Sequence, residues 1–232
     1  FIGQPLVATD PDLEQVISFE IVGGETQNLF KIKSCDGQLF VRKAVLDYET
    51  KDKHDIVVRV TDSGITGEDI LYHESTITIV IINVNESPSL TPASFSIEEN
   101  AAVGVRIGTS LSSLIIDDDN KNIERRSNYP RQTHNYEIIM GNDGETFAIN
   151  AQTGLISIKN QVSCLRDDDN ERSGCTSISF ERRSSFLLYV RITDSGLQDG
   201  SDSLSGVGRV SISVNDVNEA PVFRPQTREV DE

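Results

Sequence analysis

Tryptophan is absent from this sequence, methionine occurs once, and aromatic residues make up only 6% of its 232 residues. No apolar run approaches the roughly 18 residues that a membrane-spanning helix needs. Positive charge is also scarce, because 21 Lys and Arg stand against 37 Asp and Glu, which gives a net charge of −16. Nucleic acids and anionic membrane surfaces require a basic face, so neither is an expected partner of this segment.

Catalytic motifs are missing as well. The sequence contains no Gly-x-Ser-x-Gly, no His-Glu-x-x-His and no Gly-rich phosphate loop. His54, His73 and His134 fall in what the pattern predicts to be unrelated loops or strand edges. Neighbouring carboxylates can act as a glycosidase pair, but here their spacing repeats along the chain, which favours ion binding. We therefore expect no enzyme, no catalytic residues and no organic cofactor.

Alternation of apolar and polar residues is the main pattern in the sequence. It is clear around residues 17–21, 56–60, 77–81, 136–140, 186–192 and 210–214. Clusters of Gly, Asn, Asp and Ser separate these runs, and no long segment has a helical period. Many short strands joined by turns predict an all-β protein built from antiparallel β-sandwiches.

The sequence also repeats itself. Val-Arg-Val-Thr-Asp-Ser-Gly at 58–64 recurs as Val-Arg-Ile-Thr-Asp-Ser-Gly at 190–196. Asn-Val-Asn-Glu-Ser-Pro at 83–88 recurs as Asp-Val-Asn-Glu-Ala-Pro at 216–221. Two copies of one module therefore follow each other along the chain.

Two loops of the second copy are longer than those of the first. Residues 120–135 and 162–179 contain the extra length, and a rigid sandwich tolerates such insertions. Arginines give the acidic protein basic spots in the first of these loops and directly after the second: Arg125, Arg126, Arg131, Arg182 and Arg183. The loops are candidates for partner contacts, and solvated loops without a partner explain them equally well.

Several short acidic motifs occur in the same order in both copies. In the first copy they are Ala-Thr-Asp-Pro-Asp at 8–12, Leu-Asp-Tyr-Glu at 46–49, Thr-Asp-Ser-Gly at 61–64 and Asn-Glu-Ser-Pro at 85–88. Ile-Glu-Glu-Asn at 97–100 opens the second. Together they resemble the calcium motifs of cadherin repeats over almost the whole chain. The resemblance implies two tandem seven-stranded, Greek-key, immunoglobulin-like sandwiches.

The resemblance implies calcium as the bound ion and three groups of ligands. The junction between the copies is implied to use Asp47, Glu49, Asn85, Glu86, Asp117, Asp119 and Asp194. The end of the second copy is implied to use Glu99, Glu181, Asp216, Asn218 and Glu219. Only Asp10, Asp12 and Asp62 are present at the start of the first copy. Calcium takes six to eight oxygen ligands, which suits carboxylates gathered at strand ends.

Some positions depart from the family pattern. Asn83 stands where the family has Asp, and Ser179 replaces the first acid of the Asp-x-Glu motif that ends at Glu181. We therefore expect fewer or weaker ions at the end of the second copy. Asn85 begins a glycosylation sequon, but Pro88 follows it, and we expect this Asn to act as a ligand. The acidic run 167–170 lies inside an insertion and is expected to be a solvated loop rather than an extra metal site.

The predicted boundaries give repeats at 1–88 and 89–222 and the start of a third repeat at 223–232. The first-strand Glu of the first repeat would precede Phe1. We expect the chain to be a segment cut from the ectodomain of a larger membrane protein at the cell surface.

Three cysteines are an odd number. Cys164 and Cys175 bracket the second insertion, and we expect a disulfide between them in an oxidising extracellular setting. Cys35 is expected to be a half-buried free thiol, or else to bond to another chain. Zinc is not expected, because no Cys-x-x-Cys occurs.

The predicted function is calcium-dependent adhesion, in which ions stiffen a string of repeats and a like or unlike protein partner binds it. Other repeats of the same protein are expected neighbours. The alternative is a structural spacer or filament subunit with no recognition surface of its own.

Overall fold

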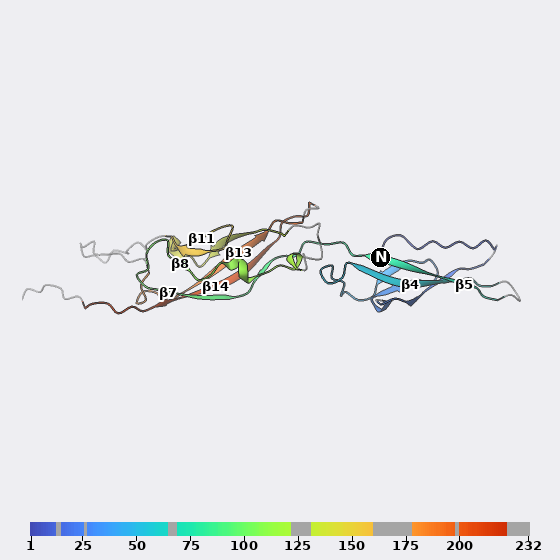
Figure 1. Cartoon of the computed structure of the whole chain (residues 1–232), viewed down its shortest axis with the longest axis horizontal. Coiled ribbons are helices and arrows are strands. Elements are labelled where there is room, and N and C mark those ends of the chain that lie inside the picture. Colours follow the sequence, from blue (N-terminus) through green and yellow to red (C-terminus); the bar gives the residue numbers. More distant parts are fainter. Residues whose placement is uncertain are drawn as a thin grey trace, which may run out of the picture. The chain divides into compact units, whose positions relative to one another are not determined.

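The computed structural model describes residues 1–12, 15–25, 27–64, 69–121, 131–159, 178–197 and 200–221. The chain forms two compact units, Phe1–Val84 and Asn85–Glu232 (Figure 1). Both are built from β-strands, as the alternation predicts, and the all-β prediction is confirmed. Within the described ranges, no helix has the length and apolarity to cross a bilayer.

The first unit pairs a three-stranded sheet with a small hairpin. Its elements are β1 (Ser18–Gly23), η1 (Gln27–Leu29), β2 (Phe30–Ile32), β3 (Leu39–Val41), β4 (Lys53–Thr61) and β5 (Tyr72–Val80). The sheet order is β1-β4-β5 with antiparallel neighbours, and β2 pairs with β3. Ile2 bridges to Leu39 at the edge of the hairpin.

The second unit repeats this plan with additional elements. They are β6 (Ser89–Leu90), β7 (Ala93–Glu98), β8 (Arg106–Ile107), η2 (Leu111–Leu114), β9 (Ile115–Ile116), η3 (Asp118–Asn120), β10 (His134–Met140), η5 (Asp143–Glu145), β11 (Phe147–Ile149), β12 (Ile156–Ile158), β13 (Ser185–Asp194) and β14 (Ser205–Asn215). One sheet has the order β10-β13-β14-β7 and another β11-β12-β8. A short β6–β9 pair completes the unit.

The two units share even their irregularities. The β1–β4 pairing shifts register between Ile21 and Gly23, and the β10–β13 pairing shifts between Ile138 and Met140. The strands β1, β4 and β5 therefore correspond to β10, β13 and β14. The second unit adds β7, which runs parallel to β14. In the described part of the first unit, no strand pairs with the outer edge of β5, and most of β5 is exposed.

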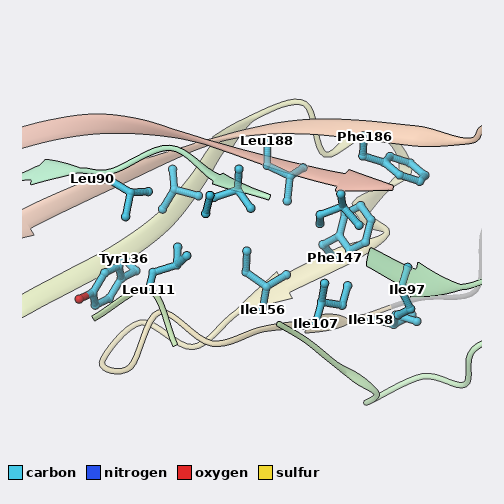
Figure 2. Packing of buried hydrophobic residues seen from close by; sticks show 14 of the residues in the cluster. Leu90, Ile97, Ile107, Leu111, Tyr136, Phe147, Ile156, Ile158, Phe186 and Leu188 are labelled. Carbon is cyan, nitrogen blue, oxygen red and sulfur yellow. The ribbon is translucent and has the colours of Figure 1, made fainter. Parts of the chain in front are cut away.

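Alternation along the strands builds the core of the second unit. Every second residue of β13 is buried, so one face of the sheet is apolar. Leu188 and Phe186 of β13 face Ile156 and Ile107 from the opposite sheet (Figure 2). Phe147 meets Phe186 edge to face with ring centroids 4.9 Å apart. This packed layer holds the strand ends, and the acidic motifs with them, in place.

The structure corrects three sequence predictions. Cys35 is exposed rather than half-buried, because it lies in the turn between β2 and β3 and not on a strand. His54 is 4% exposed within the central strand β4 rather than in a loop or at a strand edge, whereas His73 and His134 lie at the beginning of the outer strands β5 and β10. The predicted loop 120–135 is consequently too long, because β10 already begins at His134.

Other predictions lie outside the described residues. They are the Cys164–Cys175 disulfide, the acidic run 167–170, the cations Arg125 and Arg126, and the third repeat at 223–232.

Candidate metal centres

The Asp-x-Asp motif of the second unit follows the short strand β9. Asp117 is extended at the N-cap of η3, and Asp119 lies inside that single turn. The turn buries Asp117 and Asp119, at 6% and 8% exposure, whereas Asp118 between them points outward to Lys121. The spacing therefore aims two carboxylates inward and leaves the middle one in solvent.

Asp194 comes to the same end of the unit from the end of β13. Its Oδ1 accepts hydrogen bonds from the amides of Gly196 at 2.8 Å and Leu204 at 2.9 Å. These bonds fix the carboxylate, which is only 4% exposed. Asp62 is held in the same way in the first unit, by the amides of Gly64 and Leu71, both at 3.0 Å. In both copies of the Asp-Ser-Gly motif, two backbone amides thus hold the Asp carboxylate, one from the Gly of the motif and one from a Leu nine or ten residues after the Asp.

The linker residues Asn85 and Glu86 join this cluster. The Asn85 Nδ2 donates to both carboxylate oxygens of Asp194, at 3.2 and 3.3 Å, and to the Asp202 carbonyl at 2.9 Å. The Glu86 amide donates to Asp119 Oδ2 at 3.0 Å. Five of the predicted ligands therefore gather at one end of the second unit: Asn85, Glu86, Asp117, Asp119 and Asp194.

Two further residues at this cluster escaped the sequence analysis. His134 Nε2 lies 2.6 Å from Asp117 Oδ2, and Gln132 Nε2 donates to Asn85 Oδ1 at 2.7 Å. Both lie where the first insertion returns to β10. A sequence signal existed for Gln132, because Gln15 holds the matching position before Phe19 in the first copy. His134 belongs to no repeated motif, so nothing in the sequence singled it out.

Burial raises the pKa of Asp117 above its ordinary value. The hydrogen bond from His134 and its charge act in the opposite direction, while the charges of Asp119 and Asp194 raise the pKa further. Asp117 Oδ1 and Gln132 Oε1 are buried and lack a hydrogen-bond partner. Buried carboxylates and amide oxygens without donors are an arrangement that a hard cation completes, and Ca²⁺ prefers this type of ligand.

A second cluster lies where β7 ends. Carboxylate oxygens of Glu99, Glu181 and Glu219 lie within 4.8 Å of one another. Glu99 is 3% exposed and accepts the amides of Val217 at 2.7 Å and Phe180 at 3.0 Å. These two amides lower the pKa of Glu99 below its ordinary value.

Asp216 behaves in the opposite way at the same cluster. Desolvation, followed by the charges of Glu99 and Glu181, raises the pKa of Asp216. Asn100, with a φ of 59°, donates to Glu219 Oε1 at 2.7 Å. Asn218 is exposed two residues after Asp216. The cluster thus concentrates negative charge, which the backbone amides at Glu99, the Asn100 side-chain amide at Glu219 and the Ser179 hydroxyl at Glu181 offset in part.

The Asp-x-Glu motif differs between the units in a simple way. Asp47 accepts the amides of Glu49 at 2.9 Å and Thr50 at 3.2 Å, and the Thr50 hydroxyl at 2.6 Å. The Thr50 hydroxyl is the main cause of the lowered pKa of Asp47. Ser179 keeps this turn in the second unit, since its hydroxyl accepts the Arg182 amide at 3.4 Å. The second unit therefore keeps the turn, although Ser179 lacks the carboxylate that Asp47 has in the first unit.

The three acids predicted at the start of the first unit make fewer contacts with one another than those of the two clusters described above. Asp10 Oδ1 accepts the Asp12 amide at 2.9 Å. In the described part of the chain, no hydrogen bond joins Asp62 to Asp10 or Asp12.

Comparison with known proteins identifies the architecture. Residues 3–85 match the family model described as "Cadherin domain". Human Protocadherin Fat 4 is 29% identical over 212 residues, covering 89% of this chain and 4% of that protein. The Drosophila melanogaster protocadherin-like wing polarity protein stan is 28% identical over 94% of this chain and 5% of its own length. Mouse Cadherin-4 is 27% identical, covering 85% of this chain and 20% of the relative.

Solved structures show the same fold. The crystal structure of human Protocadherin-24 EC1-2 matches with a TM-score of 0.58 at 20% identity, covering 91% of this chain and 87% of that one. Mouse Cadherin-23 EC22-24 matches with a TM-score of 0.52 at 21% identity, covering 87% and 53%. At this identity the likeness establishes the fold. The chain spans at most a fifth of the curated relatives named above.

Proposed function

We propose that this segment is a pair of cadherin repeats that acts as a calcium-dependent extracellular adhesion module, because residues 3–85 match the cadherin domain model and protocadherins are similar to it along 89% of the chain. Calcium ions bound between its two repeats stiffen the segment. The stiff string of repeats presents surfaces to a protein partner, of the same or a different kind, at the surface of another cell. Neighbouring cadherin-like repeats of the same protein extend the string.

The observation that carries this proposal is the acidic end of the second unit. Asp117, Asp119 and Asp194 are each less than 9% exposed, and Asp117 Oδ1 has no donor. Buried carboxylates without a cation repel one another and resist ionisation. A bound calcium ion reverses both effects, and Asp47 and Glu49 of the first repeat complete its ligands from the other side of the linker.

The remaining acidic groups have related roles. The acidic cluster at the end of the second repeat binds ions toward a following repeat, through Glu99, Glu181, Asp216, Asn218 and Glu219. It binds fewer ions than the junction between the two repeats, because Ser179 stands where the motif has a carboxylate. Asp10, Asp12 and Asp62 serve toward a preceding repeat. A Cys164–Cys175 disulfide belongs to the same extracellular setting.

Thermal unfolding with and without calcium tests the proposal. A ligand that binds only the folded state stabilises it by about 2.7 kcal/mol at a concentration 100 times its Kd. We expect calcium chloride to raise Tm and a chelator to reverse the rise, with magnesium as the control ion. The same Tm in all three conditions contradicts the proposal.

A further inference from the structure

Gln132 is a buried glutamine at the acidic end of the second unit. Its side chain is 8% exposed, its Nε2 donates to Asn85 Oδ1 at 2.7 Å, and its Oε1 has no partner. Asn120 holds the backbone of Gln132 on both sides, by accepting the Gln132 amide at 2.9 Å and donating to its carbonyl at 3.3 Å. The residue is therefore anchored, and the acceptor oxygen of its side chain is unused.

Three acceptor atoms converge on the Nδ2 of Asn85. They are the two carboxylate oxygens of Asp194 and the carbonyl oxygen of Asp202, at 2.9 to 3.3 Å. A side-chain amide has only two N–H groups, so it cannot satisfy three acceptors fully. In this orientation the only acceptor of Asn85, Oδ1, is turned away from the acids and toward Gln132. An N–H group of Asn85, rather than its oxygen, therefore faces the Asp194 carboxylate.

We propose that Gln132 is a positioning residue for Asn85, and that the two side-chain amides invert together when a cation enters. After inversion, Asn85 Nδ2 donates to Gln132 Oε1, the atom that now lacks a partner. Asn85 Oδ1 then joins the oxygens of Asp194 and Asp202 around one point. Glutamine suits this position because it offers both a donor and an acceptor at the same length. The inference rests on the proposed calcium-binding function.

The internal repeat gives independent support. Gln15 lies four residues before Phe19, as Gln132 lies four residues before Tyr136. Gln15 Oε1 is likewise buried without a hydrogen-bond partner. The residue after each glutamine also makes the same backbone hydrogen bond. The Val16 amide donates to Ser63 Oγ at 3.1 Å, and the Thr133 amide donates to Ser195 Oγ at 3.2 Å. The same glutamine with the same unused oxygen thus stands before the acidic end of each unit.

Two substitutions shift calcium affinity in opposite directions if the amides invert. Gln132→Glu is an acceptor only, so it favours the orientation of Asn85 that presents Oδ1 to the ion. Gln132→Met accepts nothing, so the inverted Asn85 would bury an unsatisfied N–H group. We expect calcium affinity to rise for the Glu variant and to fall for the Met variant, each by about three- to tenfold, the size of one hydrogen bond.

Thr133→Glu is the matched control for charge. Thr133 is exposed and adjacent to Gln132, so this variant adds the same charge without touching Asn85. Calorimetric titration of the 232-residue chain with calcium chloride measures all four proteins, and circular dichroism checks their folding. The inference predicts that Gln132→Glu exceeds Thr133→Glu in affinity gain.

Nuclear Overhauser contacts in the unsubstituted protein test the inversion directly. Without calcium, the Asn85 side-chain N–H protons should lie near the Leu204 amide proton, whose nitrogen donates to Asp194. With calcium, they should lie near the Gln132 side chain. Unchanged contacts in a calcium-saturated sample, or affinity changes of the same sign for both Gln132 variants, overturn the inference and leave the proposed function standing. Absence of calcium binding by the unsubstituted chain overturns both.

Discussion

At the scale of single residues, Asp119 and Asp118 form a natural pair of test and control. Asp119 is buried and accepts the Glu86 amide, whereas its neighbour Asp118 is exposed and paired with Lys121. We expect Asp119→Asn to weaken calcium binding by about tenfold or more, because one ligand charge is lost, which corresponds to about 1.4 kcal/mol. Asp118→Asn should leave affinity almost unchanged. Equal losses for both variants would show that only overall charge matters.

His54 is a second residue whose effect can be predicted. It occupies the place in the first unit that Phe186 has in the second, and its ring lies 5.7 Å from that of Phe30. Both ring nitrogens of His54 are buried without a hydrogen-bond partner. Because an unsatisfied buried polar group costs about 1–3 kcal/mol, His54→Phe should stabilise the first unit by an amount in that range.

Denaturant unfolding of the chain measures this effect. The reciprocal variant, Phe186→His, should destabilise the second unit, where the ring packs against Phe147. A His54→Phe variant with lower stability than the unsubstituted protein would mean that the imidazole is bonded in solution.

At the scale of elements, two adjacent leucines of β13 allow a buried and an exposed side chain to be compared. Leu188 is fully buried, and Leu187 is 40% exposed on the other face. We expect Leu188→Ala to lower the free energy of unfolding by about 2–5 kcal/mol, through lost apolar contact and the cavity left behind. Leu187→Ala should change it little. Similar losses at both positions would contradict the assigned faces of the strand.

The turn after β7 has a pH dependence of known sign. The pKa of Glu99 is lowered by the Val217 and Phe180 amides, so its stabilising effect is present above the unfolded-state pKa and lost as pH falls through the folded-state pKa. Asp216, whose pKa is raised chiefly by desolvation, acts in reverse: stability falls as pH rises through its folded-state pKa.

Glu99→Gln tests this assignment in the presence of chelator. We expect the variant to lose less stability than the unsubstituted protein between about pH 6 and pH 3, the range in which carboxylates titrate. Parallel Tm curves for the two proteins would show that the amide contacts of Glu99 do not persist in solution.

At the scale of the whole molecule, the fold follows from the sequence more completely than the site does. Period-2 runs located β1, β4, β10, β13 and β14, because a strand with one buried face must alternate. The repeated motifs indicated acids at the ends of three such strands, Asp62 after β4, Asp194 at the end of β13 and Asp216 after β14. Gln132 and His134 were missed, because their partners Asn85 and Asp117 are distant in sequence and only the folded turn brings them together.

Calcium-dependent stiffness between the two units is the central claim, and small-angle X-ray scattering tests it most directly. In calcium, the scattering of the 232-residue chain should fit one fixed arrangement of the two units. In chelator it should require a broad set of arrangements, and added calcium should restore the first curve except in Asp119→Asn. Identical scattering in calcium and chelator, with calcium binding established by titration, would contradict the account.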